Sequence, residues 1–546
     1  MSRTKELSML DLAMFALESA ERMANVGPLA ILKPPAGYKG SSHFADWLMD
    51  RMQKKPVCEP FDYVYRPPGL RRLPRLEAAA AVDVSSHCFR LSLPAPGTDE
   101  QLFELICRLH VNRLDRSRPP WEFYIIDGLE RGRIAIYAKV HHGIIDGKTF
   151  VDVCTNWFSP DPKSREIRAL WQGVRQPRRS KSTVVEQRSL TRSAIALAKQ
   201  IAGGGATVAG FYRILIAQAL KTVGLGKGTP LPFLNTPPVF RAPPAVRRSF
   251  AYCIVPLGAM QEFGRAHDAT INDILLTILD MALNRYLDEK GRHKHKPLVA
   301  DMPLALGSGR GGNQIAILQF PLGGAKASPA ERLREITRQT GEVKRQVKGE
   351  SASAMILYTA AIHAVPAVGE LLGISNMPIL ANMVISNPYG LPGRRYLGGA
   401  DVEMILPLSV LAPGQSLNIT AASYDKGLQI AFLGIAREFP DIRKLADYTV
   451  EALEELRTAF GELTTGEVEV KKTAARKFTA ARKPAARKPA ARKTEARKPR
   501  TVAAAKQAKA AVTPAALRKR LAARPRAAAD GPRAAAKRVA REPSAV

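Results

Sequence analysis

A largely apolar segment that stops at two adjacent histidines constrains this chain more than any other feature. Residues Ile134 to Val140 have the composition of a buried strand, and His141, His142 and Gly143 follow at once. Neighbouring side chains on a strand point to opposite faces, so one histidine can face a cleft while the other packs. A neutral imidazole at a cleft can accept a proton from a hydroxyl near neutral pH. The strand end is therefore a candidate site of general-base chemistry.

A turn follows the histidines and completes the pattern His-His-x-x-x-Asp-Gly. Asp146 comes four residues after His142, where it can lock the local geometry by pairing with a basic group. Gly143 and Gly147 permit a tight turn and close backbone approach. A pair of histidines alone is more often structural than catalytic. The complete seven-residue pattern at a strand end is far more specific.

Composition excludes several classes of protein. The chain has 546 residues, which is too long for one ordinary domain. Its hydrophobic residues, 46% of the total, are ample for a large core. Five widely spaced cysteines without a C-x-x-C pair make a disulfide framework or a zinc site improbable and fit a reducing compartment. No apolar run reaches the roughly 18 residues expected of a spanning helix, and the N-terminus lacks the features of a secretory signal. We expect a cytoplasmic protein, soluble or peripheral, without a metal.

The same reasoning predicts secondary structure along the chain. The hydrophobic patterns and turn residues predict a helix over 7–18 capped by Ser8, strands over 26–32, 87–94, 123–126 and 248–256, helices over 99–113 and from 257, and paired strands near 417–420 and 428–432. Thr270 or Asn272 can cap a further helix, and the amide of Asn272 can also donate to an oxyanion or a substrate carbonyl.

Residues 194–225 are apolar but interrupted by Lys199, Arg213 and Lys221. They fit either a linker helix pair packed on the body or an amphipathic surface that touches lipid. Prolines between 230 and 244 then mark the start of a second half.

Several segments resemble one known family. The pattern at residues 141–147 resembles the superfamily of CoA-dependent acyltransferases, which includes chloramphenicol acetyltransferase and peptide-synthetase condensation domains. The family within it is indicated by segments in the same order: L-S-x-x-D at 7–11, L-D-R-S-R-P-P-W-E at 114–122, N-D-x-x-L at 272–276, G-N-Q at 312–314, S-N-P-Y-G at 386–390 and L-N-I-T at 417–420. Over residues 5–462 the chain resembles the bacterial wax ester synthase/diacylglycerol acyltransferases.

The resemblance implies an α/β, two-lobed chloramphenicol acetyltransferase-like fold with mixed sheets and a central tunnel. The corresponding divisions are an N-terminal lobe over 1–160, a crossover over 161–245, a C-terminal lobe over 246–465 and a disordered basic tail over 466–546. It also implies transfer of a long-chain acyl group from acyl-CoA, a substrate rather than a bound cofactor, to diacylglycerol or a fatty alcohol.

Residue by residue, the resemblance assigns His142 as general base and His141 to shaping the site. Asp146 would hold the loop, and Asn272 and Gly147 would bind substrate. The segment at 114–122 would be scaffold. Such an enzyme would work at the inner membrane or on lipid inclusions. Two alternatives stay open: a non-catalytic protein that tethers lipid inclusions to DNA, and an acyltransferase for a polyketide or peptide acceptor.

The tail carries most of the charge. Residues 471–546 hold 24 Lys and Arg against three Asp and Glu, a net of +21 of the total +33, which leaves +12 for the body. Arg-Lys pairs recur in A-A-R-K-P units with almost no aromatic or branched residues, so the segment cannot bury a core. We expect it to bind DNA phosphates or anionic lipid head groups, or to act only as a solubilising extension.

Overall fold

The computed structural model describes residues 3–461 except 70–71, 175–203, 226–228, 235, 293–295, 307–314, 325, 375–376, 389 and 392. The described residues all lie within one compact unit, Met1–Ala474. The predicted tail over 466–546 and the G-N-Q element at 312–314 lie outside them.

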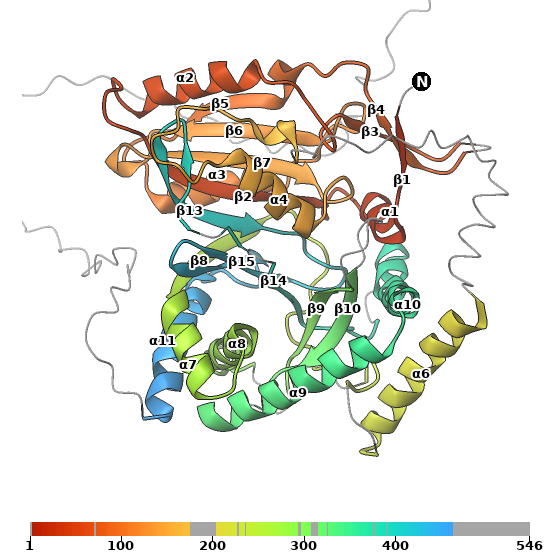
Figure 1. Cartoon of the computed structure of the whole chain (residues 1–546). Helices are drawn as coiled ribbons and strands as arrows, with labels where there is room; N and C mark the ends of the chain where they lie inside the picture. Colours follow the sequence, from red (N-terminus) through yellow and green to blue (C-terminus); the bar gives the residue numbers. More distant parts are fainter. Residues whose placement is uncertain are drawn as a thin grey trace, which may run out of the picture. The chain divides into compact units, whose positions relative to one another are not determined.

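A six-stranded mixed sheet carries the histidines (Figure 1). Its order is β12-β13-β2-β7-β6-β5. The strands are β2 (Asn25–Lys33), β5 (Cys88–Ser92), β6 (Trp121–Asp127), β7 (Ile134–His141), β12 (Tyr396–Leu397) and β13 (Ala400–Leu408). Only β5 and β6 pair in parallel; the other neighbours are antiparallel. β7 lies between β2 and β6 and is buried throughout, as its apolar composition predicts.

Alternation along β7 sends side chains to two different cores. Ile134, Ile136 and Ala138 pack in a cluster with α2 (Ser41–Gln53) and the tryptophans of the first half. Ala135 and Tyr137 face a second cluster that includes Leu102 and Ile106 of α3 (Asp99–His110). That second cluster also contains residues of β8 and β15, so α3 lies at the junction of the two halves of the body.

A second six-stranded mixed sheet has the order β10-β9-β11-β14-β15-β8. Its strands are β8 (Arg248–Pro256), β9 (Val299–Ala305), β10 (Ile315–Pro321), β11 (Met383–Ser386), β14 (Leu417–Tyr424) and β15 (Gly427–Ile435). β11 pairs in parallel with β9 and β14, whereas β14 and β15 form the predicted antiparallel hairpin. Helices cover it: α7 (Leu257–Ala266), α8 (Ile271–Glu289), α9 (Pro329–Gly349), α10 (Ala352–Leu371) and α11 (Arg443–Ala459).

Two strands cross between the halves, since β12 and β13 both belong to the first sheet. β13 follows four strands of the second sheet in sequence, yet it pairs antiparallel with β2 in the first sheet. Figure 1 shows this teal strand beside the red and orange strands of the first sheet. Val402, Leu406 and Leu408 are buried there. An apolar strand carries no mark of the sheet it will join, because burial on either sheet satisfies it equally. Sheet membership therefore does not follow the sequence boundary placed before residue 246.

The remaining elements of the first half are short. A three-stranded sheet joins β1 (Thr4–Glu6), β4 (Arg75–Ala78) and β3 (Tyr63–Arg66), and the rest are α1 (Met9–Ala16), α4 (Gly147–Trp157) and 3-10 turns at Val84–His87, Glu130–Gly132 and Leu170–Gln172. The prediction that Ser8 caps the first helix is confirmed: Ser8 and Asp11 form a reciprocal capping box. Thr270 caps α8 in the same way, so Asn272 is not the cap.

The predicted segment at 194–225 is partly described. α6 (Gly204–Thr222) packs against α10, while residues 194–203 lie outside the described part of the chain. Gln218 of α6 is buried and donates to the hydroxyl of Tyr358 in α10 at 2.7 Å. Among the described residues, α10 is the one helix long and apolar enough to cross a membrane, but it also supplies Met355 and Tyr358 to the core.

Candidate active site

β7 ends at His141 and His142 follows directly, and the backbone N–H groups of the two histidines bind to different neighbouring segments. The backbone N–H of His141 donates to the carbonyl of Pro120 at 3.0 Å, which extends the pairing with the chain before β6. The N–H of His142 donates to the carbonyl of Ala24 at 2.7 Å, on the side of β2. The strand end is therefore fixed from both neighbours.

His141 is a buried, neutral ring with a defined tautomer. Its Nδ1 accepts a hydrogen bond from the Gly143 backbone N–H at 3.0 Å, so in the neutral ring the proton must sit on Nε2. Burial, and then the charge of Arg116, lower the pKa of His141 to about 3. Its ring stacks on Phe15, with centroids 4.0 Å apart. A side chain on Gly143 would clash with the Phe15 ring, which explains the glycine here.

His142 has the different environment that strand alternation predicts. His142 is partly exposed, whereas His141 is buried. Burial is the largest influence and lowers the pKa of His142, and its own backbone carbonyl and the carboxylates of Asp11 and Asp146 oppose the shift. Nδ1 is buried and has no hydrogen-bond partner among the described residues. Nε2 is therefore the nitrogen available to a substrate.

Asp146 holds the loop by a mechanism other than the predicted ion pair. It is the N-cap of α4, and its Oδ1 accepts from the Thr149 backbone N–H at 2.7 Å. Within the described part of the chain it forms no ion pair with a basic side chain. A carboxylate at a helix N-terminus satisfies a free backbone N–H and complements the helix dipole. Gly147, the first residue of α4, is exposed and has open space where a side chain would project.

Asn272 is placed in the second half, in the first turn of α8. It is partly exposed, and no hydrogen bond joins it to the histidine motif among the described residues. Its neighbour Asp273 is buried, completes the capping box with Thr270 and accepts from the Thr340 hydroxyl at 2.6 Å. The local structure thus uses Asp273 for helix stability, and the Asn272 amide has no hydrogen-bond partner within the described part of the chain.

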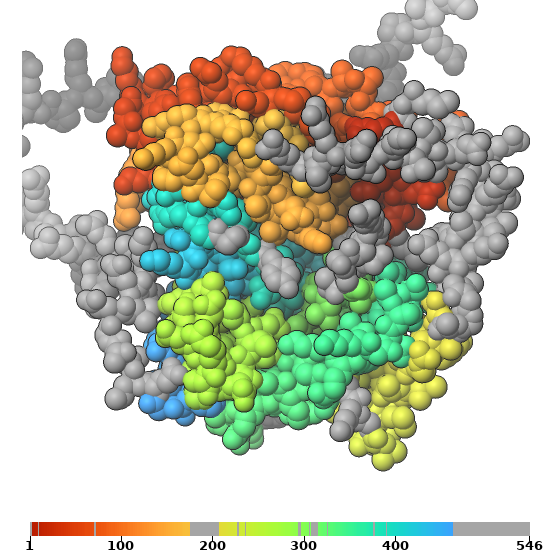
Figure 2. All heavy atoms as spheres, viewed as in Figure 1, coloured from red at the N-terminus to blue at the C-terminus, as the bar shows by residue number. Residues whose placement is uncertain are grey.

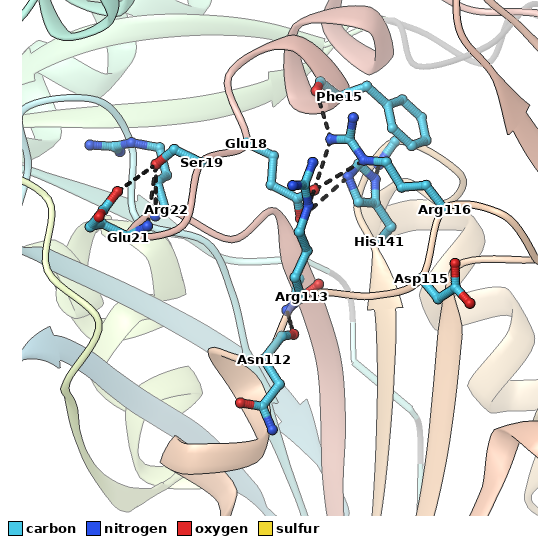
Figure 3. Close-up of polar contacts among 12 residues, drawn as sticks. Phe15, Glu18, Ser19, Glu21, Arg22, Asn112, Arg113, Asp115, Arg116 and His141 are labelled. Carbon is cyan, nitrogen blue, oxygen red and sulfur yellow. Dashed lines mark hydrogen bonds and ion pairs between the residues drawn. The ribbon is translucent and has the colours of Figure 1, made fainter. Parts of the chain in front are cut away.

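Sequence reasoning missed the residues that surround His141 (Figure 3). Glu18, just after α1, lies with its Oε1 3.9 Å from His141 Nε2, and its Oε2 accepts from Arg113 and Arg116. Arg116 belongs to the segment at 114–122, which the sequence marked as scaffold. For Glu18 and Arg116 the only available signal was the resemblance to the family, because neither residue belongs to a periodic hydrophobic pattern. None of the groups of His, Cys, Asp and Glu in the described ranges is arranged to hold a metal ion.

Two mixed sheets with paired histidines at the end of a central strand define the class of CoA-dependent acyltransferases. A model of the wax ester synthase/diacylglycerol acyltransferase catalytic domain matches residues 7–275, and one of the corresponding C-terminal domain matches residues 311–457. The chain belongs to this wax ester synthase/diacylglycerol acyltransferase family and is an acyltransferase.

Known proteins agree with the family models. The probable diacylglycerol O-acyltransferase Tgs4 of Mycobacterium tuberculosis is 32% identical over 472 residues, covering 83% of this chain and 96% of its own. A second diacylglycerol O-acyltransferase homologue of that organism is 31% identical over 508 residues, covering 85% and 100%. The structure of the wax ester synthase/diacylglycerol acyltransferase from Marinobacter aquaeolei VT8 superposes with a TM-score of 0.61 at 25% identity, covering 84% of this chain and 100% of that one.

Proposed function

We propose that the chain transfers a long-chain fatty acyl group from acyl-CoA to the hydroxyl of diacylglycerol or a long-chain alcohol. The products are triacylglycerol or a wax ester and free CoA. Acyl-CoA is a substrate, and the reaction needs no bound cofactor or metal. The family match supports the reaction class, and the substrates would meet in a tunnel between the two halves with the histidine motif at its middle.

The observation that carries the mechanism is the place of His142, a partly exposed residue directly after a buried strand, where burial lowers its pKa and so favours the neutral ring. Nε2 of His142 takes the proton of the acceptor hydroxyl while that oxygen attacks the thioester carbonyl. The resulting tetrahedral intermediate breaks its carbon–sulfur bond, and the CoA thiolate takes the proton back from the imidazolium. The acyl group passes directly to the acceptor without a covalent acyl-enzyme.

Three further residues have supporting roles in this proposal. Asp146 keeps the loop after His142 in place by capping α4. Gly147 leaves open space beside the motif, where a substrate chain can approach the backbone. Asn272 donates its amide N–H to the thioester carbonyl, whose oxygen gains negative charge during attack.

An assay with radiolabelled palmitoyl-CoA tests the reaction. Diacylglycerol and hexadecanol are offered separately, and we expect labelled triacylglycerol or wax ester to form in at least one arm. A folded protein that binds lipid and DNA but produces neither ester would favour the tethering alternative. Transfer to a peptidyl or polyketide acceptor alone would favour the other alternative.

We further propose that the enzyme works as a peripheral protein on a lipid surface, at the inner membrane or a lipid inclusion. Exposed large apolar side chains gather on α6 and on the end of α10, which pack together. They are Val208, Tyr212, Ile216, Leu220, Val223 and Leu225 on α6 and just after it, and Val365, Val368, Leu371, Leu372 and Ile374 on α10 and just after it. Figure 2 shows α6, in yellow, on the surface.

The spacing on α6 indicates a continuous apolar stripe. Val208, Tyr212, Ile216 and Leu220 recur every four residues, so they lie on one face of the helix. Tyr212 and Ile216 are 57% and 58% exposed. The opposite face is already used, since Gln218 is buried against Tyr358. A lipid surface fits the stripe because both proposed substrates dissolve in lipid and the body carries excess positive charge.

Vesicle co-sedimentation tests this surface. Replacing Tyr212 and Ile216 together by Asp should weaken binding to vesicles and slow transfer to vesicle-borne diacylglycerol, with transfer to detergent-dispersed substrate retained. Val246→Asp is a matched control, since Val246 is also exposed but lies outside α6 and α10. Equal vesicle binding by the double variant and the control would refute the assignment.

The tail is proposed to bind polyanions, either DNA phosphates or anionic lipid head groups. A protein truncated after residue 465 should retain acyl transfer on detergent-dispersed substrate and lose affinity for both polyanions. In the full-length protein, binding to polyanions should weaken steeply as the salt concentration rises, because each neutralised phosphate releases counterions. Competition between duplex DNA and anionic vesicles separates the two partners. Equal polyanion binding by the full-length and truncated proteins at low salt would show that the tail is not the polyanion-binding segment.

A further inference from the structure

Glu18 is a buried carboxylate whose two oxygens have different surroundings. Its side chain is 1% exposed. Oε2 accepts from Arg116 Nη2 at 2.7 Å, from Arg116 Nε at 3.1 Å and from Arg113 Nε at 3.2 Å. Oε1 has no hydrogen-bond partner among the described residues. An unpaired carboxylate oxygen in a buried site is costly, so its position calls for a partner.

The group that faces Oε1 is the proton-bearing nitrogen of His141. Nε2 of His141 lies 3.9 Å from Oε1 and is likewise buried without a partner among the residues described. Because Nδ1 accepts from the Gly143 N–H, the proton of the neutral ring sits on Nε2 and points toward Glu18. The two unsatisfied atoms are therefore a donor and an acceptor in the correct sense.

Arg116 connects the carboxylate to the ring that clamps His141. Besides Glu18, its guanidinium donates to the Phe15 carbonyl at 2.7 Å and lies over the Phe15 ring, 5.4 Å from the centroid. Phe15 stacks between His141 and Tyr65, at 4.0 Å and 4.1 Å. Figure 3 shows Arg116 between the Glu18 carboxylate and the Phe15 ring. Arg116 thus holds both Glu18, which faces the edge of the His141 ring, and Phe15, which stacks on the face of that ring.

We propose that Glu18 is a positioning residue for acyl transfer. It holds His141 in the Nε2–H tautomer and keeps Nδ1 as acceptor for the Gly143 N–H. That hydrogen bond shapes the turn in which His142 lies, so Glu18 sets the direction of the proposed base without touching substrate. The inference rests on the proposed role of His142.

Replacing Glu18 by Gln puts a hydrogen-bond donor in place of the acceptor that faces His141, without changing the shape of the side chain. The arginines are donors, so the Gln oxygen must face them and the Gln NH₂ group must face His141. A donor there favours the Nδ1–H tautomer, which then opposes the Gly143 N–H with a second donor. We expect kcat to fall about ten- to a hundredfold, the cost of a slightly misplaced catalytic group, with the KM for acyl-CoA unchanged within about twofold.

Two variants separate positioning from simple ion pairing. Arg113→Gln removes an ion pair to the same oxygen, but Arg113 is half exposed, and the hydrogen bond and cation–π contact to Phe15 come from Arg116, so kcat should stay within about twofold of wild type. Glu18→Asp keeps the negative charge for the arginines and withdraws it from His141 by one methylene. It should lower kcat with little loss of thermal stability, and it carries the test if Glu18→Gln does not fold.

A double-variant cycle with His141→Asn shows whether Glu18 acts through His141. The Asn oxygen can still accept from the Gly143 N–H, but the group facing Glu18 is gone. Once His141 is Asn, changing Glu18 to Gln should reduce kcat less than threefold instead of ten- to a hundredfold. Ring-¹⁵N histidine spectra should also report a change of the His141 tautomer in Glu18→Gln, which a purely structural ion pair would not produce.

The outcomes distinguish this inference from the mechanism on which it rests. A folded Glu18→Gln protein with wild-type kcat and an unchanged His141 tautomer would overturn the positioning role, whatever His142 does. Additive losses in the cycle would overturn it as well. If His142→Ala retains turnover, the proposed base is wrong, but the tautomer change in Glu18→Gln is still expected because it depends only on local hydrogen bonding.

Discussion

Two buried carboxylates, one in each half of the body, are paired with arginine and have different surroundings. The Glu18 cluster comprises Glu18, Arg116, Phe15 and His141. The Asp280 cluster comprises Asp280, Asn284 and Arg332. Asp280 of α8 is fully buried; Oδ2 pairs with Arg332 and Oδ1 accepts from Asn284 Nδ2 at 2.9 Å.

The difference lies in what each carboxylate leaves free. Both oxygens of Asp280 are satisfied, whereas Oε1 of Glu18 is unpaired and faces His141. A closed cluster contributes to stability and specificity of packing. An open one, next to a motif residue, has capacity left for function. The comparison therefore predicts that damage to the two clusters will separate turnover from stability.

The largest effect is expected at the residue that the Glu18 cluster serves. His142→Ala should reduce turnover about 100- to 10,000-fold, the usual worth of a general base, and leave the fold intact. Initial rates with palmitoyl-CoA, together with circular dichroism, measure both. A folded variant with near-normal transfer would show that His142 is not the general base, and the Glu18 cluster would then have no functional role to compare with the Asp280 cluster.

The Asp280 cluster should show the opposite behaviour. Asp280→Asn leaves the charge of Arg332 buried without its partner, so the free energy of unfolding should fall by about 3–5 kcal/mol. Its kcat, measured well below the unfolding transition, should equal that of wild type. Denaturant titration and steady-state kinetics test the pair of statements. A large loss of kcat in this variant would show that buried ion pairs affect turnover non-specifically here.

The pH dependence sharpens the distinction between the two histidines. The base must be neutral, and burial lowers the pKa of His142 below 6.5, so the acid limb of kcat/KM should lie below pH 6.5. Asp146→Asn removes a charge that raises this pKa and should move the limb further down. The free energy of unfolding should also fall as the pH drops from 6.5 toward 3. In this range His141 binds a proton in the unfolded chain but stays neutral in the folded one, because burial lowers its pKa to about 3. An acid limb above pH 7 would contradict the assignment.

The smallest effect concerns the cap beside the motif. Asp146→Ala should lower the free energy of unfolding by about 1 kcal/mol, the typical cost of losing an N-cap, and reduce activity as the loop loosens. Asp146→Asn keeps an acceptor for the Thr149 N–H and should lose less stability. Thermal unfolding of both variants provides the measurement. An Asp146→Ala protein that is inactive yet as stable as wild type would assign Asp146 to the chemistry instead.

Local features of this protein could be predicted from its sequence because they depend on neighbours in the chain. The apolar run ending at His141 predicted β7, and alternation predicted different environments for His141 and His142. Ser8 and Thr270 cap helices, as their side chains dictate. The cap at Asp146 was equally local, since Asp is a favoured N-cap, but the sequence reasoning considered only an ion pair there.

Only the tertiary structure decided which distant residues meet. Glu18 and His141 are far apart in sequence, and their contact depends on the packing of α1 against the end of β7 and on Arg116 between them. β13 joined the first sheet although its sequence fits either one. Hydrophobic periodicity fixes which face of an element is buried, because burial depends on side-chain spacing. It does not fix the partner, because apolar surfaces attract without direction, and the polar contacts that select a partner form only after packing brings them together.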